Sequence, residues 1–145
     1  MSAALYNTTI LRLAASIPHH ARLSDPHGTS ERRSPVCGSR VTVDVALGPD
    51  GRIVALGQEV RACALGQASA ALMGEHALGR TPEELSAARD ALARFLAGEQ
   101  EDPGAWPGLD LFVPARPHSA RHASIRLAFE AVSEAAERAA ARPPA

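Results

Sequence analysis

The sequence predicts an α+β protein in which helices pack on one face of a small antiparallel sheet of about three strands. From Arg40 to Leu47, valine and leucine alternate with more polar residues, which is the period-two pattern of a strand with one buried face. The residues from Gly48 to Gly51 then favour a tight turn, because proline fixes φ and glycine allows a positive φ. Helical patterns lie on both sides of this hairpin, and the order of helix, strands and helices is typical of the α+β class.

Before the hairpin, the apolar spacing predicts a helix over Ala4–Ile17, which Pro18 ends. The stretch from His19 to Ser34 is rich in proline, serine, histidine, glycine and charge, and it is expected to be a loop.

After the turn, Arg52 to Ala55 is expected to return as the second strand. Gly57 interrupts the pattern as a bulge or bend would, and Gln58 to Ala62 is expected to be a third short strand.

The second half of the chain reads as helices. Thr81 as cap, Pro82 at the first helical position and Glu84 three residues after the cap make a strong helix start. The elements expected are a helix over Ala64–Leu78, a helix to about Ala97, a helical turn or extended piece over Leu109–Val113, and a last helix from Arg121 or Ala123 to about Ala141.

Composition narrows the function classes. The 145 residues suit a single domain over 1–145, with a disordered tail expected after about residue 141. The net charge is −1 and the fifteen basic residues, all arginine, are scattered along the sequence, so no nucleic-acid partner is predicted. With no secretory signal and no apolar run of about 20 residues, we expect a cytoplasmic protein without a membrane partner.

The two cysteines are the candidates for chemistry. A reducing compartment disfavours a disulfide between them. Cys37 precedes a glycine at the entrance to the first strand, which suits a metal ligand or a sulfur acceptor. Cys63 lies where a strand gives way to a helix, and a helix N-terminus favours the thiolate. Taken alone, a cysteine of this kind is more often a small buried apolar residue. Among the six histidines, only His122 is considered as a ligand.

Four segments, read together, carry a resemblance. Their order and spacing resemble those of the U-type iron–sulfur cluster scaffold family (the N-terminal domain of NifU, IscU and SufU). The segments are Leu5-Tyr6 with Ile10-Leu11, then Pro35-Val36-Cys37-Gly38-Ser39-Arg40, then Cys63-Ala64-Leu65-Gly66-Gln67-Ala68-Ser69-Ala70-Ala71-Leu72-Met73, and finally Ala120 to Phe129.

The resemblance implies a site with two of its four positions changed. Family members hold zinc, iron or a nascent [2Fe–2S] cluster with three cysteines and an aspartate. Cys37 and Cys63 match the first two cysteines, and Ser39 stands at the aspartate. Ser124 stands at the third cysteine, although an alternative register places Ala123 there.

The function implied is that of an iron–sulfur cluster assembly scaffold or sulfur acceptor, and not a conventional enzyme. Iron or a [2Fe–2S] cluster would bind through Cys37 and Cys63, with zinc as another metal. The missing ligands would come from His122, solvent, a small thiol or a second subunit, so a homodimer stays open. The partners implied are a cysteine desulfurase and apo iron–sulfur acceptor proteins.

Two alternatives remain. The first is a metal-free family member that binds a partner such as a desulfurase. The second is a zinc-dependent sulfurtransferase like SufU. Convergence of the two cysteine sulfurs within about 4 Å would favour the scaffold, because ligands of one zinc lie about 2.3 Å from it.

Overall fold

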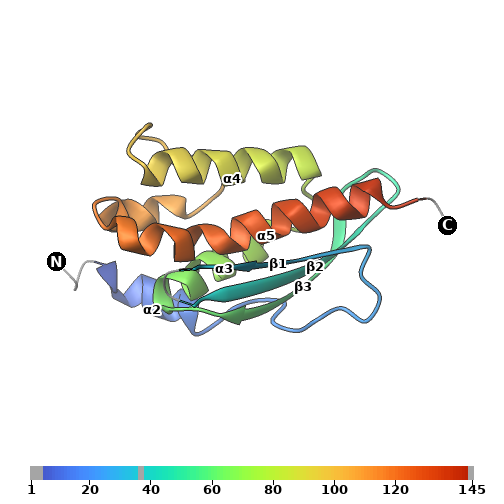
Figure 1. The fold of residues 1–145 in the computed structure, drawn as a ribbon, viewed down its shortest axis with the longest axis horizontal. Coiled ribbons are helices and arrows are strands. Elements are labelled where there is room, and N and C mark those ends of the chain that lie inside the picture. Colours follow the sequence, from blue (N-terminus) through green and yellow to red (C-terminus); the bar gives the residue numbers. More distant parts are fainter. Residues whose placement is uncertain (1–4, 36–37, 144–145) are drawn as a thin grey trace.

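The computed structural model describes residues 5–35 and 38–143 and has three layers (Figure 1). A three-stranded antiparallel sheet in the order β1-β2-β3 forms one layer, α3 and α5 lie on one of its faces, and α4 packs on α5. The elements are α2 (Thr8–Ala14), β1 (Gly28–Arg33), β2 (Arg40–Leu47), β3 (Ile53–Arg61), α3 (Ala64–His76), α4 (Pro82–Leu96), the 3-10 helices η1 (Leu109–Ala115) and η2 (Ser119–Arg121), and α5 (His122–Ala141). The predicted α+β class is confirmed.

The core runs through all three layers, from β2 through α3 and α5 to α4 and η1. Val41, Val43 and Val45 of β2 are fully buried, as their alternation predicts. Because α5 lies between the sheet and α4 (Figure 1), small alanines fill much of its surface and allow close packing on both sides. Gly28 of β1 shows how close this is, since a Cβ there would overlap the backbone of Ala135.

The prediction of a loop over His19–Ser34 was wrong at its end, because β1 lies within it. This strand, Gly-Thr-Ser-Glu-Arg-Arg, contains no large apolar residue that periodicity could detect. It is held by pairing with β2 and by polar contacts to α5, where Ser30 donates to Glu134 and Arg32 lies 3.6 Å from the same carboxylate. An edge strand of this kind depends on tertiary partners rather than on its own pattern.

The prediction of two strands separated at Gly57 was also wrong. β3 is continuous, and Gly57 pairs in register with Asp44. The irregularity lies instead between Ala46 and Leu47. A Cβ at Gly57 would overlap the backbone of Ala21, so this glycine marks the close approach of another chain segment.

The helix predictions were more accurate than the strand predictions. The capping box of α4 is present in both directions, between Thr81 and Glu84. Leu109–Val113 is helical, as part of η1, and α5 has the predicted extent. Of the expected helix Ala4–Ile17, α2 covers only Thr8–Ala14. The Asn7 side chain accepts a hydrogen bond from the Ile10 amide and caps its start, and Ala15 is its C-cap. Leu5 is helical but is separated from α2 by Tyr6 and Asn7, and Ala4 lies outside the described residues. Among the residues described, no helix has both the length and the apolar character needed to cross a membrane.

Candidate functional site

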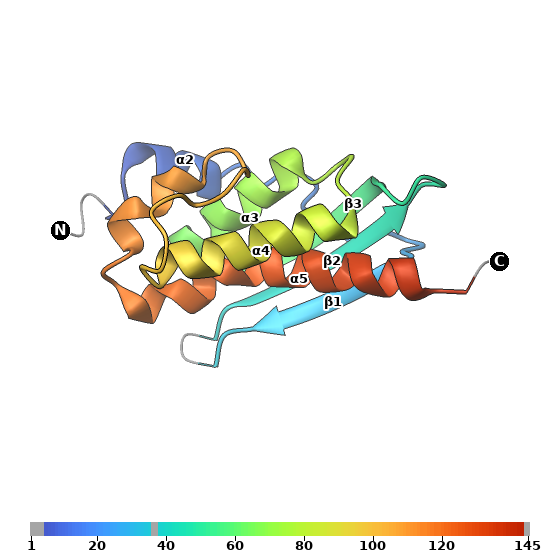
Figure 2. The ribbon, with the colours of Figure 1, turned by 90° about the horizontal axis from the view of Figure 1, so that it is seen from above.

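Three segments of the chain meet at one end of the sheet. Ser39 directly precedes β2, Cys63 follows β3 as the N-cap of α3, and Ser124 lies in the first turn of α5. Figure 2 shows α3 and α5 beginning at the same end of the molecule. Residues that are far apart in the sequence are therefore brought together by the packing of two helix starts against a strand entrance.

The side chains of these residues are in contact. The Ser124 Oγ lies 3.2 Å from the Cys63 Sγ and 3.3 Å from the Ser39 Oγ. Both serines are buried, while Cys63 is partly exposed and is a free thiol. We refer to these residues as the Ser39–Ser124–Cys63 cluster. Because it is Ser124 whose side chain reaches Cys63, the geometry favours the register that places Ser124 at the family's third cysteine.

Two residues of α3 allow this approach, and the sequence interpretation gave neither a role at the site. A Cβ on Gly66 would lie 2.5 Å from the Ser124 Oγ and 2.8 Å from the Ala62 Cβ, so only glycine leaves room for the serine. One turn later the Ser69 hydroxyl donates to the Ile125 carbonyl at 2.6 Å. A glycine inside a helix is the one sequence signal of such a contact, because glycine weakens helices and needs a packing reason.

The hairpin between β1 and β2 positions Ser39. The Ser34 amide donates to the Ser39 carbonyl at 2.8 Å, and the Gly38 amide donates to the Ser34 carbonyl at 3.1 Å. Gly38 has φ = 73°, in the left-handed region that favours glycine. Cys37 lies outside the described residues, so the convergence of its sulfur with that of Cys63 stays a prediction.

His122 makes different contacts. Its Nε2 lies 2.9 Å from the Ala115 carbonyl oxygen and 3.0 Å from the Arg116 carbonyl oxygen. Both partners are acceptors, so this nitrogen donates its proton and holds the end of η1 against the start of α5. The Nε2 atom is thus used in a hydrogen bond that holds the fold together.

The side chains of the Ser39–Ser124–Cys63 cluster do not match the ligand set of a closed zinc site. Structural zinc takes four ligands from thiolate, imidazole and carboxylate groups. The cluster offers one thiol and two neutral hydroxyls, and Cys37 would add one more thiol. Within residues 5–35 and 38–143, no three His, Cys, Asp or Glu side chains come together as a metal site.

Similarity to known proteins agrees with this architecture. No family model matches the sequence. The crystal structure of a nitrogen-fixing NifU-like protein (N-terminal) from Brucella abortus is 36% identical, covers 98% of this chain and 99% of its own, and superposes with a TM-score of 0.92. The iron–sulfur cluster assembly scaffold protein IscU of Thermotoga maritima is 27% identical over 131 residues, which are 90% of this chain and 92% of that protein.

A further structure shares the fold. It is that of a putative iron–sulfur cluster assembly scaffold protein for the SUF system from Fervidobacterium islandicum, with 21% identity, 94% of this chain and 99% of that chain covered, and a TM-score of 0.85.

The fold is that of a scaffold-type α+β protein, and the Ser39–Ser124–Cys63 cluster lies at one end of its sheet. The chain belongs to the U-type iron–sulfur cluster scaffold family.

Proposed function

We propose that this protein accepts sulfur, or a nascent iron–sulfur cluster, on Cys63 together with Cys37 during cluster assembly. The observation that carries the proposal is the contact of Cys63 with Ser124 and, through it, with Ser39. These residues are the ones that the resemblance matches to three of the family's four site positions, and Cys63, which is partly exposed, is the one that carries a thiol.

The chemistry requires little of the protein. The Cys63 thiolate attacks the outer sulfur of a persulfide on a donor such as a cysteine desulfurase. The sulfur–sulfur bond of the donor breaks, its cysteine leaves as a thiolate, and Cys63 becomes the persulfide, so no external oxidant or reductant is needed. The thiolate is the nucleophile in this step.

The cluster also supports a second candidate, a metal-free family member that binds a partner. The Ser124 hydroxyl is within hydrogen-bonding distance of both the Ser39 hydroxyl and the Cys63 thiol, so the polar groups of the cluster have partners without a metal. Such a protein would keep the fold and the partner surface but carry no cargo.

Anaerobic reconstitution separates the two candidates. The protein is incubated with iron and sulfide, and in parallel with a cysteine desulfurase and cysteine. Visible absorption, iron and sulfide contents, and the intact mass of each species are then measured. We expect a cluster spectrum that is lost in both Cys63→Ala and Cys37→Ala, and a persulfide on Cys63 that is lost in Cys63→Ala.

The matched control is Ser133→Ala, on the same helix as Ser124 but bonded to Arg89 instead. It should load as the unchanged protein does. Neither cluster nor persulfide on the unchanged protein would exclude cargo binding and leave the partner-binding candidate.

A further inference from the structure

The strand pairing gathers three arginines that are scattered in the sequence. Arg33 of β1 pairs with Arg40 of β2, and Arg40 pairs with Arg61 of β3. Directly paired residues project from the same face of a sheet. We call these residues the arginine row; it crosses all three strands at one end of the sheet.

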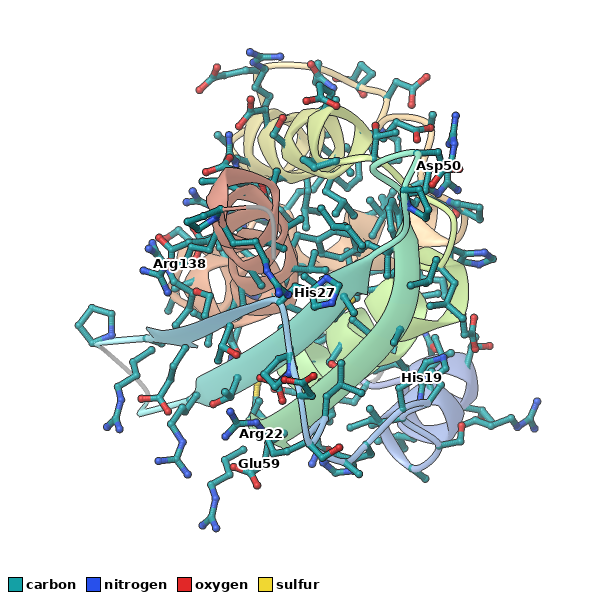
Figure 3. All side chains as sticks on the ribbon, turned by 90° about the vertical axis from the view of Figure 1, so that its right-hand side faces the viewer. His19, Arg22, His27, Asp50, Glu59 and Arg138 are labelled. Atoms are coloured by element: carbon teal, nitrogen blue, oxygen red, sulfur yellow. The ribbon has the colours of Figure 1, made fainter. Side chains whose placement is uncertain are left out.

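The arginine row lies on the face of the sheet away from the helices. Its neighbours along the strands point the other way, since Arg32 reaches Glu134 of α5 and Val41 is fully buried. Glu59, two residues before Arg61 and so on the same face, is seen with Arg22 on the side opposite α4 and α5 (Figure 3). The loop that contains Arg22 covers the next part of this face, at Asp44.

Much of the charge of the row is not neutralised. The Arg33 Nε lies 2.9 Å from the Glu31 carboxylate, and the Arg33 side chain is 65% exposed. Arg40 and Arg61 form no ion pair with any described residue. Like charges directly opposite one another destabilise a sheet. A surface that retains such a row gains stability when a partner supplies negative charge.

The row lies at the same end of the sheet as the Ser39–Ser124–Cys63 cluster, but on the opposite face, because the cluster packs against α5. Arg40 directly follows Ser39, and Arg61 lies two residues before Cys63. A partner that binds the arginine row and extends around this end of the sheet would therefore reach the partly exposed thiol.

The next row on this face decides between kinds of partner. It consists of Glu31, Thr42 and Glu59. A nucleic acid or an anionic membrane would meet these two carboxylates as well as the arginines, and the chain as a whole carries a net charge of −1. A protein surface can instead place its own acidic residues against the arginine row alone.

We infer that the arginine row is the docking surface for an acidic polypeptide segment of the protein that exchanges sulfur or cluster with Cys63. The identity of the exchanged group rests on the proposed function. The surface itself follows from the strand register and the charges.

The test uses an oligoglutamate peptide titrated into the isotope-labelled protein, with amide chemical shifts as the readout. Shifts should concentrate around Arg33, Arg40 and Arg61. The triple variant R33Q/R40Q/R61Q should bind about tenfold more weakly. A triple with the same change in charge, R12Q/R94Q/R142Q, removes exposed arginines elsewhere and should bind as the unchanged protein does.

Several outcomes would overturn the inference. They are no peptide binding, equal weakening in both triple variants, equal binding of an oligoglutamine peptide, and tighter binding of a single-stranded oligonucleotide of the same charge. The single variant R40Q changes one strand residue instead of three and so disturbs the sheet least. It should also bind the oligoglutamate peptide more weakly than the unchanged protein. Because the peptide titration needs no iron, sulfide or thiol, it remains readable if cargo binding fails.

Discussion

Ser124 contacts both other members of the cluster, so its side chain controls which groups surround Cys63. A thiol at position 124 would lie beside the Cys63 sulfur and raise the number of cysteines from two to three. We expect Ser124→Cys to bind zinc about a hundredfold more tightly than the unchanged protein. This is roughly the part of the binding free energy that one ligand contributes to a four-ligand site. Competition with a zinc-binding dye measures this.

Ser133→Cys is the matched control for this substitution. Ser133 is also a buried serine of α5, but its hydroxyl contacts Arg89. An equal gain in zinc affinity in both variants would show that position 124 has no special relation to Cys63.

Asp44 illustrates a different residue-scale effect, the stabilisation of a buried charge. Its carboxylate is fully buried and accepts hydrogen bonds from the Arg22 guanidinium at 2.7 and 3.1 Å, the Leu23 amide at 3.0 Å and the Thr29 hydroxyl at 2.6 Å. Burial alone would raise the pKa of Asp44, but these bonds, with that from Arg22 the strongest, outweigh it and hold the pKa below its ordinary value.

A lowered pKa in the folded state fixes the pH dependence of this stabilisation. The unfolded aspartate has a pKa of about 3.9, so the contacts of Asp44 stabilise the fold above about pH 4, and the contribution is lost as the pH falls through the folded pKa. We expect Asp44→Asn to lower the free energy of unfolding by about 2–3 kcal/mol near neutral pH. The difference should shrink in acid.

Urea unfolding across pH measures both effects. Asp50→Asn, at an exposed turn residue, serves as the control and should change little. A difference for Asp44→Asn that stays constant down to acid pH would contradict this account of the carboxylate.

At the scale of elements, the contact between α3 and α5 builds the site. Replacing a glycine by alanine inside a helix normally raises the free energy of unfolding by up to about 1 kcal/mol. In Gly66→Ala the added Cβ would meet the Ser124 Oγ at 2.5 Å, so we expect the free energy of unfolding to fall by about 1–3 kcal/mol. Denaturant unfolding checks the sign. In the double variant G66A/S124A the hydroxyl is gone, and part of the loss should be recovered; strictly additive losses would show that the two positions do not touch.

Elements were predictable where their signals are local. The capping box of α4 needs only Thr81, Pro82 and Glu84, and the valines of β2 show which of its faces packs on the helices, although Asp44 on the other face is buried as well. β1 gives no such signal, because Ser30 and Arg32 face α5 with polar side chains whose partners lie about a hundred residues away. The prediction at Gly57 was wrong for the same reason. A glycine is required there because the backbone at Ala21 crosses close by, and the sequence of the strand does not indicate that crossing.

The site was predictable only in part, and for a physical reason. Cys63 could be placed at a helix start from its neighbours, and the structure makes it the N-cap of α3. Its association with Ser39 and Ser124 depends on the packing of α3, α5 and the sheet entrance, which only the resemblance could suggest. The arginine row likewise arises from strand register, since nothing in the spacing of Arg33, Arg40 and Arg61 indicates that they lie side by side.

At the scale of the whole molecule, the number of thiols sets the stoichiometry of the cargo. A [2Fe–2S] cluster takes four ligands, most often cysteine thiolates, and each chain has two cysteines. If Cys37 and Cys63 are the ligands, a loaded cluster needs two chains. We therefore expect reconstitution to convert the protein into a dimer that carries one cluster per two chains, as measured by anaerobic native mass spectrometry and iron content.

The variant S39D/S124C tests whether added ligands within one chain remove the need for a second chain. It restores the three cysteines and the aspartate of the family's site within one chain, so it should load one cluster per monomer. The unchanged protein should lose its cluster on dilution, because the dissociation of the two chains removes half of the ligands, whereas the variant should keep it. A monomeric, loaded form of the unchanged protein, with one cluster per chain, would mean that groups other than a second pair of thiols complete the site.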